Sequence, residues 1–179
     1  YFGYDSLRPG QQELIEGILQ RKDVLGIMPT GAGKSLCYQV PALMLDGITI
    51  VVSPLISLMT DQVKALNQAG VHAAYINSSL TENQIRTALF YAAQGRYKII
   101  YVAPERLNTI RFLEFACQVD ISMVTVDEAH CISQWGQDFR PSYVGIADFL
   151  AQLPKRPVVS AFTATATERV KQDIMGSLR

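Results

Sequence analysis

Cysteines, long hydrophobic runs and an excess of either charge are all scarce in this sequence. It has three cysteines, an odd number at wide spacing, which excludes a disulfide framework and favours a reducing compartment. The most apolar stretch, 48–59, is broken by polar residues and is too short to cross a membrane. No basic leader followed by an apolar run is visible, so we expect a cytoplasmic protein with no membrane partner.

The charges of the chain cancel, with 16 basic and 16 acidic residues among 179. Proteins that bind nucleic acid by themselves usually carry a basic patch. The neutral balance therefore argues against an independent, tight nucleic-acid binder, and any such contact has to be local or shared with another part. We expect a fragment of a longer protein, because the sequence starts at Tyr1 without methionine and stops at Arg179 within a helical pattern.

A glycine-rich stretch, 28–35, is the most informative part of the sequence. It reads Met-Pro-Thr-Gly-Ala-Gly-Lys-Ser and lies between an apolar run, 24–27, and a helical pattern, 36–45. Strand, glycine loop, Lys-Ser and helix are the arrangement that holds a nucleotide triphosphate. The candidate phosphate-binding residues are Thr30, Gly31, Ala32, Gly33, Lys34 and Ser35.

Each residue type in this loop has a physical reason. Gly31 and Gly33 let backbone N–H groups approach phosphate oxygens, and the following helix directs its positive end at the same anion. Lys34 adds a charge near the outer phosphates, and the Ser35 hydroxyl can ligate Mg²⁺. The strict pattern requires a glycine where this chain has Met28, and the alternative interpretation is a plain glycine turn before a helix.

Apolar strand patterns and helical patterns alternate along the rest of the chain. This alternation predicts an α/β fold with a mostly parallel sheet covered on both faces. The expected strands are 24–27, 48–52, 73–76, 98–102, 121–126 and 158–162. The expected later helices are 55–66, 81–93 with a capping box at its start, 112–117, 143–153 and 167–178.

Five of these strands are followed by short polar phrases. In an open α/β sheet, ligands bind outside the carboxyl ends of the strands. If the strands are parallel, the phrases line one edge of the sheet and form a nucleoside-triphosphatase site. The phrases are 29–31, 53–55, 103–106, 127–130 and 163–165.

Asp127 and Glu128 end the most apolar strand, where two carboxylates without partners would be costly to bury. Asp127 is predicted to hold Mg²⁺ opposite Ser35, and Glu128 to act as the general base for the attacking water. The alternative is a pair of acids favoured by a helix N-terminus. His130 and Cys131 are adjacent, but no Cys or His pair elsewhere completes a tetrahedral set, so zinc is not expected.

The N-terminal segment, 1–22, is rich in turn formers and aromatic residues ahead of the glycine loop. We interpret it as a lid over the base of the nucleotide. The Gln11 amide offers both a donor and an acceptor to an adenine edge, and Tyr4 or Arg8 can stack on the ring. The alternative is a simple helix cap with a surface lid.

The loop 131–141 contains the only tryptophan of the sequence, next to the paired carboxylates. Its functional interpretation is a stacking platform for single-stranded bases at Trp135, with Arg140 serving phosphate contact or coupling to the site. The alternative is a local mini-core of aromatic side chains.

Together these stretches resemble the RecQ family of superfamily-2 DNA helicases, specifically the first RecA-like motor domain of the bacterial type. The resemblance covers essentially the whole chain, and its most discriminating part is the run 130–136, His-Cys-Ile-Ser-Gln-Trp-Gly. Segment 7–11 is similar to the family's motif 0, 28–35 to motif I, 52–59 to motif Ia, 103–106 to the next DNA-backbone motif, 127–130 to motif II and 162–167 to motif III.

The resemblance implies a role for each matching residue. It supports Gln11 as the adenine reader, and it makes 131–141 the loop that senses single-stranded DNA and couples it to hydrolysis. The implied catalytic residues are Lys34, Asp127, Glu128 and His130. The implied DNA-contacting or coupling residues are Ser53, Pro54, Glu105, Arg106, Trp135, Phe139, Arg140, Thr163 and Thr165.

The resemblance also implies the fold, reaction and partners. Residues 1–179 would form a single RecA-like three-layer α/β/α domain that uses ATP and Mg²⁺. The parent would be a 3′–5′ DNA helicase of repair and recombination at the bacterial nucleoid. Its partners would be single-stranded and duplex DNA and a second RecA-like domain, absent from this sequence, so the isolated domain should bind nucleotide but hydrolyse it slowly. Two alternatives are a superfamily-2 RNA-remodelling enzyme and a nucleotide-gated binding module without motor action.

Overall fold

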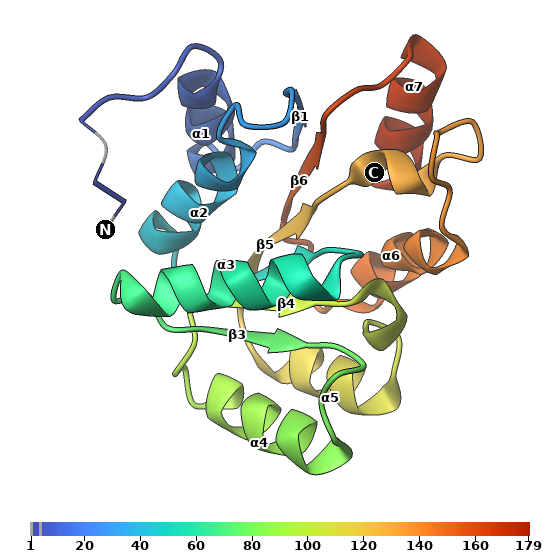
Figure 1. Ribbon diagram of the computed structural model, residues 1–179. Coiled ribbons are helices and arrows are strands. Elements are labelled where there is room, and N and C mark those ends of the chain that lie inside the picture. Colours follow the sequence, from blue (N-terminus) through green and yellow to red (C-terminus); the bar gives the residue numbers. More distant parts are fainter. Residues whose placement is uncertain (1, 4) are drawn as a thin grey trace.

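A six-stranded parallel sheet forms the centre of the molecule (Figure 1). The computed structural model of the chain describes residues 2, 3 and 5–179, so the predicted role of Tyr4 falls outside the described residues. The strand order is β1-β6-β5-β2-β4-β3, and every neighbouring pair is parallel. The strands are β1 (Val24–Ile27), β2 (Ile48–Val52), β3 (Ala73–Ile76), β4 (Ile99–Val102), β5 (Ile121–Val126) and β6 (Val158–Thr163).

Helices cover both faces of this sheet. One core cluster joins the sheet to α1 (Gln11–Leu19), α2 (Lys34–Met44) and α3 (Ile56–Gln68). The other core cluster joins the opposite face to α4 (Glu82–Ala93), α5 (Ile110–Gln118), α6 (Pro141–Gln152) and α7 (Glu168–Ser177). The predicted three-layer α/β/α fold is therefore confirmed.

Alternation along the central strands assigns their side chains to the two layers. On β2, Ile50 and Val52 pack into the cluster with α4 to α7, whereas Val51 packs into the cluster with α1 to α3. On β4, Ile100 and Tyr101 separate in the same way. Because successive side chains of a strand point to opposite faces, a strand between two helical layers is mostly apolar along both faces.

Local signals set the helix ends. The predicted capping box of α4 is present, since the Thr81 hydroxyl accepts from the Gln84 backbone N–H at 3.3 Å and the Gln84 amide oxygen accepts from the Thr81 N–H at 2.8 Å. Helix α6 begins at Pro141, two residues earlier than predicted, because proline suits the first helical position. Helix α5 also begins two residues early, at Ile110.

The strand register places the carboxyl ends at one edge. Ile27 pairs with Thr163, and Val126 pairs with both Val52 and Ala161, so the last residues of neighbouring strands lie nearly level. The segments after these strands consequently share one rim of the sheet. Among the helices that the structure describes, none is long and apolar enough to span a membrane.

Candidate active site

The glycine loop connects β1 to α2 at the carboxyl edge. Gly31 and Gly33 have φ angles of +82° and +81°, a left-handed conformation that side chains disfavour. Gly33 is the N-cap of α2, and no side chain caps this helix. The first N–H groups of α2 therefore remain available to an anion.

Two residues of the N-terminal segment hold this loop. The Arg8 guanidinium donates to the Gly31 carbonyl at 2.8 Å. The Gln11 amide donates to the carbonyls of Ala32 and Gly33 at 3.3 and 3.1 Å, and its oxygen accepts from the Arg8 N–H at 2.7 Å. Gln11 is buried, with 1% of its surface exposed. The adenine contact predicted for Gln11 stays a prediction, and it requires the amide to share or release these partners.

The paired carboxylates meet the glycine loop at this edge. The Lys34 ammonium lies 3.9 Å from a Glu128 carboxylate oxygen. Glu128 has a φ of +50°, which is rare outside glycine and places its side chain directly after β5. The chain thus brings together a cation and an acid that are 94 residues apart, which requires β1 and β5 to end at the same rim.

Asp127 is the buried member of the acid pair, with 8% of its surface exposed. Burial raises its pKa to about 6; the neighbouring Glu128 charge also raises it, and Lys34 opposes the shift. The carboxylate accepts one hydrogen bond, from the Glu128 N–H at 3.0 Å. A group that is buried, negative and sparsely hydrogen-bonded fits a divalent cation.

Oxygen donors for such a cation come from both sides of the rim. Asp127 supplies a carboxylate from the end of β5, and Ser35 supplies a hydroxyl from the first turn of α2. Carboxylate and hydroxyl oxygens are the hard ligands that Mg²⁺ uses, together with water and phosphate oxygens. The chemistry of these two oxygen donors therefore fits Mg²⁺, and the assignment of Ser35 and Asp127 as its ligands stays a prediction.

His130 links the loops that follow β5 and β6. Its Nδ1 lies 2.8 Å from the Thr163 hydroxyl and 3.4 Å from a Glu128 carboxylate oxygen. The Thr163 hydroxyl donates its proton to the Thr165 carbonyl at 3.1 Å, so its oxygen must accept from His130. These contacts assign the proton of a neutral His130 to Nδ1 and leave Nε2 unprotonated.

The loop 131–141 projects its tryptophan to the surface. Trp135 is 60% exposed, and the Arg169 guanidinium lies 3.5 Å from the centre of its ring. The ring borders a pocket of about 450 Å³ between this loop and residues 164–167. The exposure of Trp135 argues against the alternative interpretation, in which the aromatic residues of this loop form a local mini-core. Phe139 is half-buried. Arg140 pairs with Asp138 at 2.9 Å.

The remaining predicted DNA residues follow β2 and β4. Ser53 is buried at 1% exposure, and its hydroxyl has no hydrogen-bond partner among the described residues. Pro54 is half-buried and Glu105 is exposed. Arg106 pairs with Glu82 at 3.4 Å. By strand order this group lies on the far side of β5 from the glycine loop, on the same rim.

Sequence reasoning missed several residues that support this rim. Arg169 lies on the surface of α7, and nothing in its sequence context indicates a contact with Trp135. Tyr143 was expected only within a helix, yet its hydroxyl donates to the Asp127 carbonyl at 2.8 Å and fixes the turn after β5. The signal available in the sequence was the hydroxyl of this tyrosine, which follows the acidic segment 127–130 and can donate a hydrogen bond to it.

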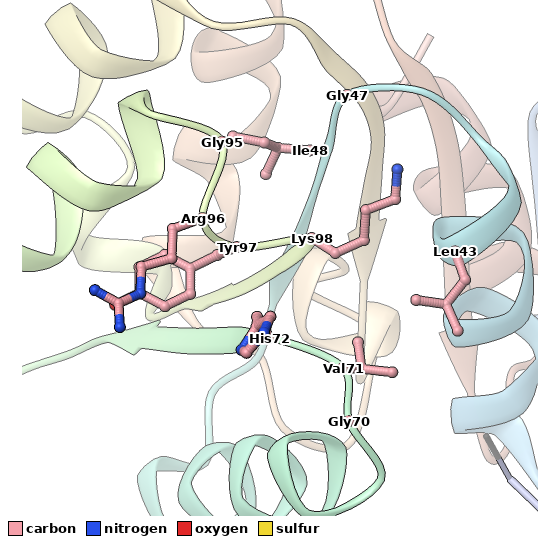
Figure 2. Close-up of a pocket in the computed structure, with 10 residues that line it drawn as sticks. All are labelled: Leu43, Gly47, Ile48, Gly70, Val71, His72, Gly95, Arg96, Tyr97 and Lys98. Atoms are coloured by element: carbon pink, nitrogen blue, oxygen red, sulfur yellow. The ribbon is translucent and has the colours of Figure 1, made fainter.

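A second pocket, of about 500 Å³, lies at the opposite edge of the sheet, near the starts of β2, β3 and β4 (Figure 2). None of its ten described lining residues is acidic. The Lys98 ammonium there donates to the Leu45 carbonyl. None of those lining residues belongs to the glycine loop or to the acid pair at the carboxyl edge.

Comparison with known families gives a clear match. The family described as DEAD/DEAH box helicase matches residues 8–174. The ATP-dependent DNA helicase RecQ of Bacillus subtilis is 52% identical over 179 residues, which cover 99% of this chain and 30% of that protein. The RecQ helicase of Pasteurella multocida is 48% identical, over 99% of this chain and 28% of that protein. The chain thus spans about a third of the length of these relatives.

Solved structures share the fold at low sequence identity. The helicase domain of Pyrococcus furiosus Hef aligns with a TM-score of 0.72 and 20% identity, over 96% of this chain and 36% of that one. The DEAD-box helicase Mss116, solved with single-stranded RNA and a nucleotide analogue, aligns with a TM-score of 0.75 and 20% identity, over 98% of this chain and 39% of that one. At such identities the likeness concerns the fold.

Proposed function

Because the chain belongs to the DEAD/DEAH box helicase family, we propose that it is the ATP-binding motor domain of a RecQ-type DNA helicase. The observation that carries this proposal is the 3.9 Å approach of Lys34 and Glu128 across the carboxyl edge. It joins a phosphate-binding loop to an acid that can activate water, which is what nucleotide hydrolysis requires.

The glycine loop and α2 bind the triphosphate. Backbone N–H groups from Gly31 to Ser35 surround the phosphate oxygens, and Lys34 turns from Glu128 to the outer phosphates. Ser35 and Asp127 would hold Mg²⁺, which would neutralise phosphate charge. The segment 1–22 acts as the adenine lid, with Arg8 and Gln11 already seated on the loop.

Glu128 orients the attacking water and accepts its proton. Once Lys34 engages phosphate, the Glu128 carboxylate loses its cationic neighbour and becomes a better base. The Nδ1 atom of His130 lies 3.4 Å from the second carboxylate oxygen, and this neighbour limits the directions in which the acid can turn. Burial of β5 beneath these groups limits their movement and keeps the geometry ready for reaction.

The rim also carries the coupling to DNA. Trp135 offers an exposed ring on which single-stranded bases stack, and Phe139 and Arg140 complete that loop. Thr163 and Thr165 relay the nucleotide state through His130. The backbone of the strand runs past the segments after β2 and β4, namely Ser53, Pro54, Glu105 and Arg106.

The complete protein needs more than this chain. Its relatives are about three times as long, and we assign the opposite wall of the ATP site to a second RecA-like domain. The isolated chain should bind nucleotide but turn it over slowly, because loss of an arginine finger costs ~10³-fold or more in rate. The complete protein moves 3′ to 5′ on DNA and serves repair and recombination at the bacterial nucleoid.

A Glu128→Gln variant of the complete protein tests the proposal. ATP should still bind, since Lys34 and the loop are intact, whereas hydrolysis should fall by ~10²–10⁴-fold, the usual contribution of a general base. Equal loss of binding and hydrolysis would instead make Glu128 a structural residue. Stimulation of the ATPase by single-stranded DNA but not by RNA is expected, and the reverse would favour an RNA-remodelling enzyme.

A further inference from the structure

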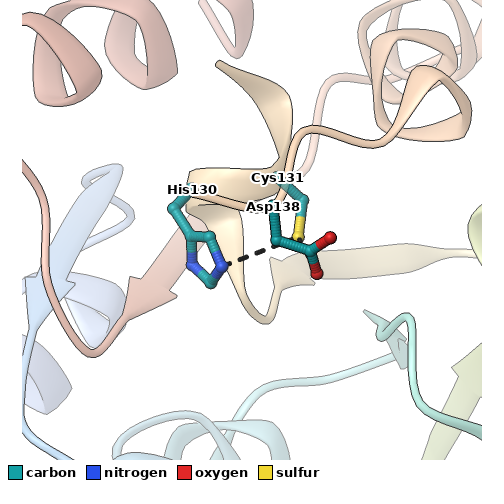
Figure 3. Close-up of side chains that lie close together, drawn as sticks. All are labelled: His130, Cys131 and Asp138. Atoms are coloured by element: carbon teal, nitrogen blue, oxygen red, sulfur yellow. Dashed lines mark hydrogen bonds between the residues drawn. The ribbon is translucent and has the colours of Figure 1, made fainter. Parts of the chain in front are cut away.

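Three side chains of different chemistry converge beside the proposed active site (Figure 3). The Cys131 sulfur lies 3.8 Å from His130 Nε2 and 3.9 Å from Asp138 Oδ2, and one ligand atom from each residue lies within 4.8 Å of the others. ATP hydrolysis gives no role to Cys131 or Asp138. We propose that these residues form a binding site for a borderline-soft divalent cation, with Zn²⁺ as the fitting ion.

Two of the three separations lie close to those of a tetrahedral site, and the third, between His130 and Asp138, is at most 4.8 Å. A Zn²⁺ ion binds nitrogen, oxygen and sulfur at about 2.0–2.3 Å, so tetrahedral angles hold neighbouring ligand atoms about 3.3–3.6 Å apart. The two measured separations exceed this range by a few tenths of an ångström, which small side-chain rotations remove. Three protein ligands leave the fourth position to water.

The hydrogen bonds of His130 prepare it as a ligand. Its Nδ1 donates to Thr163, so the lone pair of Nε2 faces the Cys131 sulfur. Metal-binding imidazoles commonly donate their other N–H in this way, which fixes the tautomer and the ring orientation. The ligand is thus oriented before any cation arrives.

Backbone contacts hold the third ligand close. The Arg140 N–H donates to the Cys131 carbonyl at 3.0 Å, which closes the loop between these residues. The Arg140 guanidinium donates to Asp138 Oδ2 at 2.9 and 3.0 Å. Both Arg140 bonds fall on Oδ2, so a cation would bind Asp138 through its other oxygen, Oδ1, after a small rotation of the carboxylate. A sequence search for Cys and His pairs overlooks this carboxylate.

The ligand set selects the ion. Thiolate and imidazole favour Zn²⁺ over Mg²⁺, which prefers oxygen ligands throughout. Binding forms a sulfur–metal bond and releases the thiol proton of Cys131 to solvent. An occupied site would tie the Trp135 loop to the turn after Glu128 and so slow its response to DNA. That consequence rests on the proposed function, whereas metal binding itself does not.

Cobalt provides a direct probe of the site in this chain, because a thiolate ligand gives Co²⁺ a charge-transfer absorption and tetrahedral geometry gives strong visible bands. We expect both bands at one Co²⁺ per chain, their displacement by one equivalent of Zn²⁺, and no displacement by excess Mg²⁺. Cys131→Ser should lose the charge-transfer band. Asp138→Asn, on an exposed side chain, should weaken Co²⁺ binding at least tenfold.

Cys117→Ser is the matched control, because Cys117 is an exposed thiol on α5. Its bands should equal those of the unchanged chain. Absence of a thiolate band in the folded chain, or its loss in Cys117→Ser with retention in Cys131→Ser, would overturn the proposal. Circular dichroism of each variant separates loss of a ligand from loss of the fold. If Cys131→Ser proves to be unfolded, the Co²⁺ affinity of Asp138→Asn decides the test instead. The Co²⁺ spectra do not depend on ATP binding. The metal-site proposal and the proposed function can therefore fail independently.

Discussion

The Nδ1 atom of His130 and the hydroxyl of Thr163 lie 2.8 Å apart and join the loop that follows β5 to the last residue of the adjacent strand β6. Thr163 is fully buried, so this hydrogen bond is shielded from water. The same imidazole nitrogen lies 3.4 Å from Glu128. We therefore expect a movement at the end of β6 to reach the acid that we assign as general base.

Thr163→Val should uncouple these two segments while sparing nucleotide binding. The variant removes one buried hydrogen bond and leaves His130 without its acceptor, which costs ~1–2 kcal/mol. In the complete protein we expect DNA-stimulated ATPase to fall roughly five- to thirtyfold with ATP affinity nearly unchanged. Thr87→Val, on the exposed side of α4, is the control. Full stimulation in Thr163→Val would refute the coupling role.

Comparing Gly33→Ala with Gly31→Ala separates the cost of backbone strain in the glycine loop from the cost of a steric clash with Gln11. Both positions have φ near +80°, so each alanine pays a conformational strain of ~1–2 kcal/mol. A Cβ atom at Gly31 meets nothing within 4 Å, whereas one at Gly33 would lie 2.3 Å from the Gln11 amide nitrogen. Thermal unfolding should show Gly33→Ala to be clearly less stable. Equal thermal stability of the two variants would mean that the Gln11 side chain does not make a tight contact with Gly33.

Asp127→Asn should stabilise the metal-free chain near neutral pH. The folded pKa of Asp127 is about 6 against an ordinary 3.8, so its ionised form disfavours the fold by about 3 kcal/mol. As pH falls through 6, the native state binds a proton first and the unchanged chain gains stability. The advantage of Asp127→Asn in denaturant unfolding should therefore be largest at about pH 7.5 and shrink towards about pH 4. A pH-independent difference would contradict this assignment.

Trp135→Ala should alter DNA response rather than stability. Its ring is largely exposed, and its contact with Arg169 contributes only ~0.5–1 kcal/mol at such a site. The complete protein should keep its basal ATPase and lose most DNA stimulation. Phe149→Ala, in the core, is the stability reference and should cost ~3–5 kcal/mol. Destabilisation of Trp135→Ala by a similar amount would favour a packing role.

The strands and their common edge could be predicted from the sequence, for a physical reason. Strands such as β2 and β5 are buried on both faces, which favours mostly apolar runs that are visible without coordinates. The turn chemistry around Gly31 and Thr81 is equally local, so the glycine loop and the capping box were found where predicted.

Contacts between surface side chains could not be predicted in this way. The position of Arg169 over Trp135 depends on how α7 packs beside the loop 131–141, and no local pattern encodes that distance. The burial of Gln11 against Gly33 depends likewise on the packing of α1 against α2. Sequence chemistry predicted an adenine contact for Gln11, which stays a prediction, and only the fold shows that its amide holds the loop itself.

The most direct test of the account is the affinity of this chain for a fluorescent ATP analogue with Mg²⁺, measured for the unchanged chain, Lys34→Ala and Lys64→Ala. Lys64 is an exposed lysine on α3 and serves as the control. We expect Lys34→Ala to lose ~1.5–3 kcal/mol of binding free energy, roughly ten- to a hundredfold in affinity, and Lys64→Ala to bind normally. Equal affinity of all three proteins would contradict a nucleotide site at the carboxyl edge.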